Sequence, residues 1–192
     1  MQLPKKELPA EAVKFNEPNT IEAFLFQAIP YALFSILIFC ILSVASYAVH
    51  RSARVTDISA IGIIVSLVSI VVHEFLHAFA FGKNADTELF FLPKYLIVFG
   101  ICTKAVTKRY YVFIMLFPSV ILGWIPFLLW FALPYIEFYS NFLLTFSFIS
   151  IVGSAGDYLK AFNALKQMPK GSIQQSSGFN SYWYLPDVPP SN

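Results

Sequence analysis

Long apolar stretches dominate the chain, and its polar residues are concentrated in the segments between them. The apolar runs cover residues 24–49, 58–81, 110–133 and 138–153, and the last one continues with helical character to residue 165. A helix that crosses a membrane needs about 20 mostly apolar residues. We therefore predict four transmembrane helices, with Pro118 and Pro126 as kinks in the third, which neighbouring helices tolerate.

This pattern divides the chain into three parts. A polar arm over residues 1–23 precedes a membrane domain over residues 24–167, and a tail over residues 168–192 is rich in Pro, Gly and Ser. The tail carries no clear signal of regular structure. The predicted fold class is an all-α membrane protein with four transmembrane helices, in which a short re-entrant β segment can lie between the second and third helices.

One apolar segment is too short to cross a membrane. Residues 89–102 are interrupted by Pro93, Lys94 and Gly100, and their core is rich in residues that favour β-structure. A strand or a re-entrant hairpin at the cytoplasmic interface fits this pattern. An irregular amphipathic segment on the membrane surface fits it equally well, because short apolar runs are ambiguous by pattern alone.

Composition supports the membrane interpretation and excludes several classes of protein. Hydrophobic residues make up 57% of the 192 residues and charged residues only 12%, against roughly a quarter charged in soluble domains. A soluble fold of this size cannot bury so much apolar surface, so the lipid bilayer is the expected surrounding. The net charge of +2 gives no reason to expect a nucleic-acid partner. Cys40 and Cys102 form no spacing motif.

Lys and Arg are distributed unevenly between the two sides of this topology. With four spans, both termini and the loop between the second and third helices share one side, which holds eleven of the thirteen basic residues. The opposite side holds only Arg51 and Arg54. Because cytoplasmic loops are enriched in Lys and Arg, we expect a multi-pass protein of the cell membrane with both termini in the cytoplasm.

Candidate chemistry lies in the second apolar run. His73, Glu74 and His77 form an H-E-x-x-H sequence, which contains two of the three histidines of the chain. Residues four apart share one face of a helix, so both imidazoles can bind one Zn²⁺ while Glu74 reaches its water. The alternative is a chance match within a helix bundle. Ionisable groups inside a membrane helix are costly and usually functional, which favours zinc.

A catalytic zinc usually has three protein ligands. Other candidates fall on the opposite side of the membrane or on a loop: His50, Asp57, Glu137, Asp86 and Glu88. Asp157 lies near the cytoplasmic end of the fourth helix, at a depth similar to that of His77, and small residues before it allow close helix approach. We predict Asp157 as the third ligand; the alternative is an interfacial carboxylate paired with Lys160.

Three features together resemble a known family. They are His-Glu-Phe-Leu-His in a membrane helix, the Gly156-Asp157 pair on a later helix, and a tail with Pro169-Lys170-Gly171 followed by Tyr182-Trp183-Tyr184. The chain resembles the bacterial family of small membrane proteins called putative zincin peptidases, which look like distant relatives of site-2 intramembrane metalloproteases. The resemblance covers most of the chain, from the second helix to the tail.

Site-2 proteases take two His ligands and a catalytic Glu from H-E-x-x-H and a third ligand from a distant Asp. The resemblance therefore implies His73, His77 and Asp157 as metal ligands and Glu74 as general base. The usual site-2 Asp stands in a Leu-Asp-Gly context, whereas this chain reads Ala-Gly-Asp-Tyr over residues 155–158.

The expected function is that of a membrane-embedded zinc metalloendopeptidase. It would hydrolyse peptide bonds near the cytoplasmic membrane face, with a zinc-activated water and Glu74 as general base. Its expected partner is a membrane-anchored or membrane-associated protein or peptide, and a strand within residues 89–106 would let an extended substrate add to its edge. Two other classes stay open: a zinc-binding protein without proteolysis, and an accessory membrane protein whose polar cluster only fixes helix packing.

Overall fold

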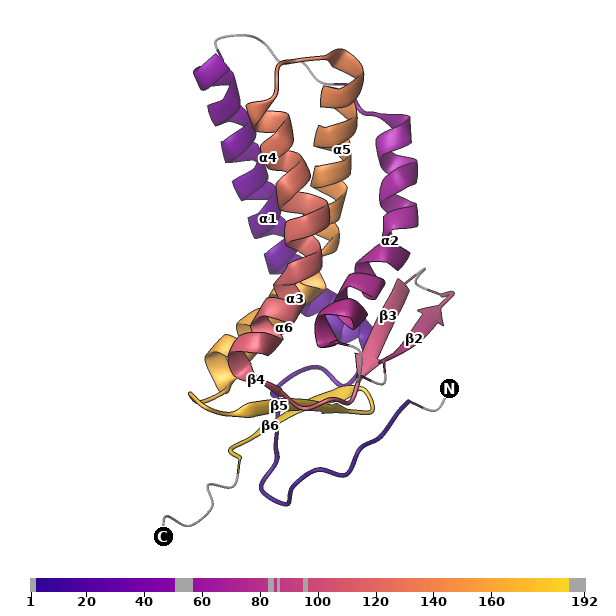
Figure 1. Cartoon of the computed structure of the whole chain (residues 1–192), viewed down its shortest axis with the longest axis vertical. Helices are drawn as coiled ribbons and strands as arrows, with labels where there is room; N and C mark the ends of the chain where they lie inside the picture. Colours follow the sequence, from indigo (N-terminus) through magenta and orange to yellow (C-terminus); the bar gives the residue numbers. More distant parts are fainter. Residues whose placement is uncertain (1–2, 51–56, 83–84, 86, 95–96, 187–192) are drawn as a thin grey trace.

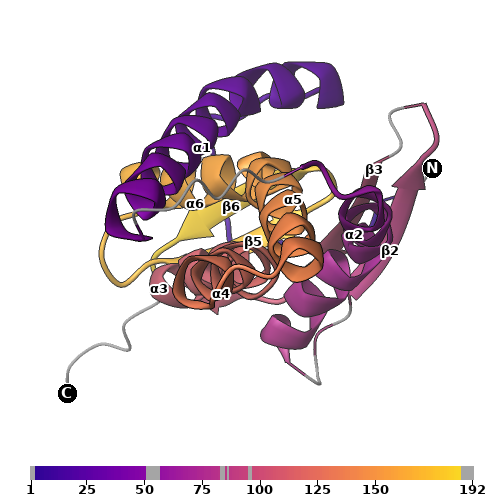
Figure 2. The ribbon, with the colours of Figure 1, turned by 90° about the horizontal axis from the view of Figure 1, so that it is seen from above.

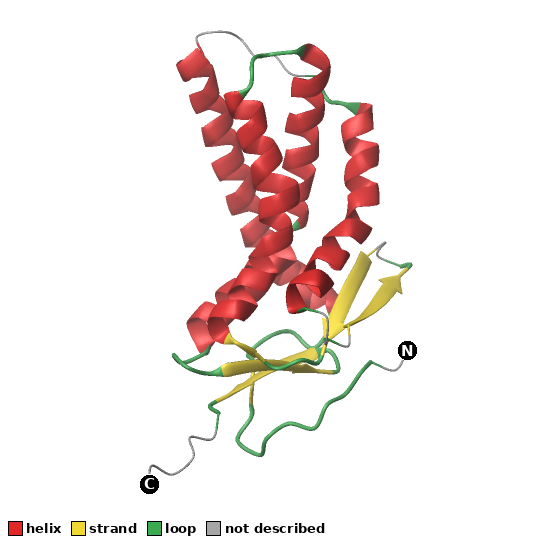
Figure 3. Cartoon of the chain, in the orientation of Figure 1, coloured by secondary structure: helices red, strands yellow, loops and turns green. Residues whose placement is uncertain are grey.

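A bundle of long helices stands on a small layer of β-sheet (Figure 1). The computed structural model describes residues 3–50, 57–82, 85, 87–94 and 97–186. Figure 3 shows the strands at one end of the molecule, where the described parts of both termini also lie. The opposite end carries the connection over residues 133–136.

The helices follow the apolar runs closely. Their bounds are α1 Ile21–His50, α2 Ala60–Phe81, α3 Lys108–Ser119, the π-helical segment η1 Val120–Trp124, α4 Ile125–Ala132, α5 Glu137–Gly153 and α6 Ala155–Gln167. Three described helical segments, residues 21–46, 60–81 and 108–132, are long and apolar enough to cross a membrane. The prediction of a mainly helical chain, with helices long and apolar enough to cross a membrane, is confirmed. Four spans result only if α5 and α6 cross as one bent unit.

The ends of α2 are set by local hydrogen bonds. The Ser59 side chain accepts a bond from the Gly62 backbone N–H at 3.1 Å and so caps the start of the helix. At the other end, Gly82 has φ +88°, a conformation that favours glycine. Lys104 donates from Nζ to the Phe81 carbonyl at 2.8 Å, which places a cation at the helix C-terminus.

The third span runs without interruption through its prolines. Between Pro118 and Pro126 the backbone forms the π-helical turn η1, an irregularity of the kind that accompanies kinks in helices. Pro126 lies in the first turn of α4, where its missing N–H costs little. In η1, Gly123 lies against Ile151 of α5 so closely that an added Cβ would be 2.6 Å from Ile151 Cγ1. This glycine therefore allows the two helices to touch.

The fourth predicted helix is broken. The sequence suggested that it continues to residue 165, but α5 ends at Gly153 and α6 leaves it at an angle of 45°. The bend places Asp157 in the first turn of α6, where the helix dipole favours a carboxylate. The break thus determines where the predicted third ligand lies.

The segment that was ambiguous in the sequence is a β-hairpin. Strands β2 (Thr87–Leu92) and β3 (Ile97–Cys102) pair antiparallel, with Leu89 opposite Gly100 and Phe91 opposite Val98. The strand interpretation is confirmed and the irregular one is wrong. Figure 1 shows this hairpin beside the sheet end of α2, and Figure 2 shows it on the outside of the bundle.

A second, four-stranded sheet corrects two predictions. It contains β1 (Val13–Lys14), β4 (Val106–Thr107), β5 (Ile173–Ser177) and β6 (Asn180–Tyr184) in the order β1-β6-β5-β4, all antiparallel. The tail therefore has regular structure over much of its length. The predicted class allowed only for a short β segment between the second and third helices, and so it omits this four-stranded sheet. The polar Gln and Ser residues of β5 hide the alternation that predicts a strand, and β1 and β4 are too short to give a signal.

The N-terminal arm is held against this sheet. Phe15 is 3% exposed within the core at the sheet end of the bundle, and its N–H donates to the Ser181 carbonyl at 2.9 Å. Further along, the Gly178 N–H donates to the Pro4 carbonyl at 2.8 Å. The arm is thus a part of the fold as well as a polar approach to α1.

The close contact at Gly123 gives a stability prediction. Gly123→Ala should lower the free energy of unfolding by about 1–3 kcal/mol, because the new methyl group overpacks the contact with Ile151. Gly153→Ala is the matched control, since no atom outside its own helix and chain neighbours lies within 4 Å of its added Cβ. It should leave the unfolding midpoint unchanged or slightly raised. Thermal unfolding of both variants in the same detergent checks this; equal midpoints would contradict it.

Candidate metal centre

Two turns of α2 bring three possible ligands to one place. His73 and His77 are four residues apart and their ring centroids lie 5.0 Å from each other. One donor atom from each of His73, Glu74 and His77 can be chosen so that all three lie within 4.8 Å of one another. This convergence follows from helix periodicity, as the sequence predicted.

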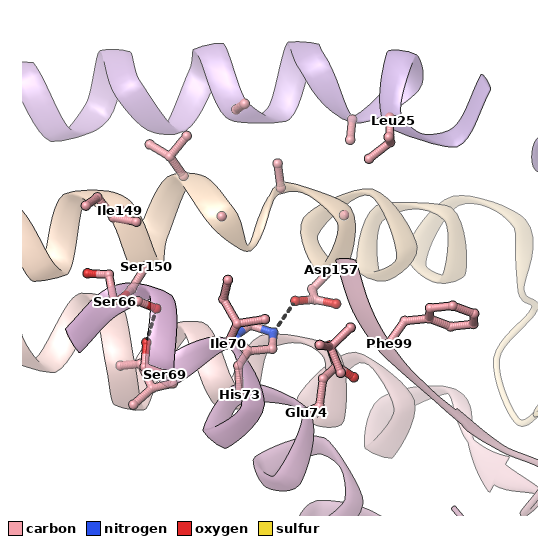
Figure 4. A pocket seen from close by; sticks show the side chains of 18 of the residues that line it. Leu25, Ser66, Ser69, Ile70, His73, Glu74, Phe99, Ile149, Ser150 and Asp157 are labelled. Carbon is pink, nitrogen blue, oxygen red and sulfur yellow. Dashed lines mark hydrogen bonds and ion pairs between the residues drawn. The ribbon is translucent and has the colours of Figure 1, made fainter. Parts of the chain in front are cut away.

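Asp157 reaches the same place from α6. Its Oδ2 lies 2.8 Å from His73 Nε2, and its Oδ1 lies 3.3 Å from His77 Nε2. Figure 4 shows the Asp157 carboxylate pointing from α6 toward His73 on α2. The carboxylate is thus shared between the two imidazoles, although 84 residues separate it from His73.

The orientation of His77 indicates what this arrangement can hold. Its Nδ1 lies 2.9 Å from the Ile114 carbonyl oxygen, which can only accept a hydrogen bond, so Nδ1 carries a proton. In the neutral ring, Nε2 then presents a lone pair toward the Asp157 oxygen. His77 Nε2 is buried and makes no hydrogen bond with any described residue.

Two electron-pair donors that face each other in a buried site are stabilised by a proton or a metal ion shared between them. A divalent metal can take this position, and a ligating His commonly donates its other N–H to a backbone carbonyl, as His77 does here. Nitrogen and carboxylate donors of this kind suit zinc. The residues present therefore fit a zinc ion.

Glu74 is held by a residue that sequence reasoning did not single out. Its Oε2 accepts a hydrogen bond from the Gly100 backbone N–H of β3 at 2.7 Å. A Cβ on Gly100 would lie 3.3 Å from the same oxygen, so glycine permits the close approach. The sequence signalled this position only as a glycine inside an apolar segment, which is typical of a strand approached by another group.

A cavity of about 460 Å³ adjoins this cluster. It lies between α1 and α2, with α5, α6 and β3 completing its wall, and apolar side chains such as Leu25 and Ile70 make up most of it (Figure 4). Its polar side chains come from α2, α5 and α6: Ser66, Ser69, His73, Glu74, Ser150, Asp157 and Lys160. The cluster is therefore open to a molecule that enters between the helices.

The other candidates lie elsewhere. Asp57 bonds through its backbone N–H to Asn141 near the start of α5, at the end of the bundle opposite the sheets. Glu137 begins α5 and His50 ends α1 at that same end. Glu88 lies on β2, and Cys102 is buried in the core cluster near the sheet. Asp86 falls outside the described residues.

Comparison with known proteins gives one finding. A family model described as "Putative zincin peptidase" matches residues 66–173, which is more than half of the chain and includes most of α2 and all of β3 and α6. No curated protein and no solved structure matches significantly.

Proposed function

The chain belongs to the putative zincin peptidase family, and from this premise we propose that it is a membrane-embedded zinc peptidase. The observation that supports the proposal best is the convergence of His73, His77 and Asp157, whose donor atoms meet beside a cavity. A peptidase also needs a base near the metal, and Glu74 lies in the same cluster. The finer, site-2-protease-like type stays a prediction.

We assign His73, His77 and Asp157 as the zinc ligands. Bound zinc would supply Lewis acidity, which polarises a peptide carbonyl and eases the ionisation of water. The His77–Ile114 bond fixes the tautomer that presents Nε2 to the metal. Asp157 would contribute negative charge, because its carboxylate already spans both imidazoles.

Glu74 is the proposed general base. Its carboxylate would take a proton from the water that attacks the peptide carbonyl carbon, and return this proton to the amine that leaves when the C–N bond breaks. The Gly100 N–H orients one carboxylate oxygen through a 2.7 Å bond. The other oxygen is then available for the water.

The membrane setting follows from the position of the site along the helices. His73 and His77 lie in the part of α2 nearest the sheets. At this same end Lys104 donates to the Phe81 carbonyl, and Lys108 and Lys166 lie on α3 and α6. By the positive-inside rule this end faces the cytoplasm. Water would reach the site from that side, while the cavity between α1 and α2 would admit a membrane-associated substrate.

Strand β3 offers a place for an extended substrate. Gly100 directs its N–H to Glu74 and away from β2, so the Gly100–Leu89 pair is a non-hydrogen-bonded pair of the ladder. Because such pairs recur every second residue, Val98 also turns its N–H away from β2. Val98 lines the cavity. An extended peptide could therefore add to this edge beside the site.

The ligand assignment predicts which substitutions remove zinc. Asp157→Ala and His77→Ala should each lower the purified protein from one zinc per chain to well below one, because each removes one of three ligands. Glu88→Gln is the control, since it removes a nearby carboxylate on β2 that we do not assign to the site. Metal analysis by mass spectrometry measures this. Full zinc in Asp157→Ala would exclude Asp157 as a ligand.

Glu74 separates a peptidase from a protein that only binds zinc. Glu74→Gln should keep bound zinc but lower the cleavage of a membrane-anchored reporter by roughly 10²–10⁴-fold, the usual contribution of a general base. Reporter cleavage and zinc content are measured on the same preparation. Wild-type turnover in this variant would leave a zinc-binding role, and absence of zinc from the wild-type protein would leave a role in helix packing.

The proposed substrate-binding role of the β3 edge can be tested by substituting each residue of one cross-strand pair in turn. Val98→Pro removes an outward N–H from the edge beside the cavity and should reduce reporter cleavage while zinc stays bound. Phe91→Pro removes an outward N–H from the opposite edge of the same hairpin, because Phe91 pairs with Val98. It should therefore leave cleavage much less affected. Equal loss in both variants would indicate disruption of the hairpin rather than of a substrate-binding edge.

A further inference from the structure

A second cavity lies next to the first, at the sheet end of the molecule. It has a volume of about 150 Å³ and is lined by the N-terminal arm, β3 and the β5–β6 hairpin. The two cavities share four lining residues: Phe24, Leu25, Phe99 and Lys160. A bound peptide that extends from the first cavity into the second therefore passes these four residues. Lys160 is the only charged residue among the four.

No described carboxylate forms an ion pair with Lys160, although Glu17, Glu74 and Asp157 line the same two cavities. The Lys160 Nζ lies 5.8 Å from the centre of the Phe24 ring, and it makes no hydrogen bond or ion pair with a described residue. Other lysines at this end do have partners: Lys104 donates to Phe81, and Lys108 donates to Leu165. Lys160 thus presents a partly buried cation between two cavities.

Glu17 is the carboxyl group that lines the second cavity together with Lys160. It is hydrogen-bonded to a backbone group rather than to Lys160. Its Oε1 accepts a hydrogen bond from the Ser181 backbone N–H at 2.5 Å. Burial raises the pKa of the Glu17 carboxyl above its ordinary value, against the opposing effects of Ser181 and Lys160. Glu17 is therefore a weak competitor for the Lys160 ammonium.

The position of Lys160 on α6 determines how far it lies from the proposed metal site. It follows Asp157 by three residues, which corresponds to about 4.5 Å along the helix axis. An extended peptide advances about 3.3 Å per residue. A substrate side chain that meets Lys160 therefore belongs to a residue within about two positions of the bond at the metal site.

We propose that Lys160 binds a carboxylate of the substrate, so that the enzyme selects peptides with an acidic side chain within two residues of the scissile bond, on the side nearer the sheets. This inference rests on the proposed peptidase function and adds a substrate class to it. The cavity wall is mostly apolar, so a salt bridge formed there is screened less than one at the surface. The alternative role, a lysine that only anchors α6 at the membrane surface, predicts no substrate preference.

The test uses single-span reporter proteins that differ at one position. Each reporter has an Ala-rich segment where its transmembrane helix meets the cytoplasm. One residue of this segment is Glu, Gln or Lys, and the set of reporters places this residue at each position in turn. The wild-type protein should cleave the best Glu reporter at least about tenfold faster in kcat/KM than its Gln counterpart, as expected for a hydrogen bond to a charged group. Lys160→Met should abolish this preference, and Lys160→Glu should shift it to the Lys reporter.

Lys166→Met is the matched control, because Lys166 is an exposed lysine on the same helix. It should keep the preference for Glu. A Lys160→Met variant that still prefers Glu, or a wild-type protein that prefers neither reporter, would overturn the proposal. The charge swap in Lys160→Glu is informative because a purely structural role cannot produce it.

A binding measurement separates this proposal from the peptidase function. Fluorescent peptides with the same Glu or Gln are titrated into Glu74→Gln protein, and the Glu peptide should bind about tenfold more tightly. Adding Lys160→Met should remove the difference. Equal binding of both peptides overturns the role of Lys160 whether or not the protein is a peptidase. Absence of cleavage of every reporter, with the binding difference intact, counts against the peptidase function alone.

Discussion

The contact of one carboxylate with two imidazoles is the constraint on which the site depends. Asp157 lies between His73 and His77 only because α6 leaves α5 at a 45° bend and meets α2 at the sheet end of the bundle. The Ile114 carbonyl on α3 fixes the second imidazole. Helices α2, α3 and α6 must therefore hold their positions for these polar groups to be satisfied in an apolar bundle.

The β2–β3 hairpin contacts both the polar cluster and the adjoining cavity. Gly100 bonds to Glu74, and the neighbouring residues Val98 and Phe99 line the cavity between α1 and α2. A short piece of sheet thus stands beside the polar cluster of a helical bundle. Such an edge presents backbone groups that β2 does not pair, and next to long apolar helices such groups are tolerated where they line a cavity.

Sequence reasoning succeeded where a local period carries the information. The helices follow from runs of apolar residues, and the convergence of His73 and His77 follows from their spacing of four. The placement of Asp157 near them came from a depth argument. The four-stranded sheet was missed because its pairs, such as Val13 with Trp183, join distant segments whose residues give no alternation. The bond from Gly100 to Glu74 is likewise a tertiary contact without a local signal.

The pairing of the two terminal segments affects the order in which the protein is built. Strand β1 is synthesised before the first helix, yet its partner β6 follows the last one, and Gly178 bonds back to Pro4. During translation the arm therefore has no β6 partner until the last helix has been synthesised. The four-stranded sheet beneath the site can form only after β6 has been synthesised. A chain truncated before β6 would therefore contain every helical segment but lack the β1–β6 and β5–β6 pairs.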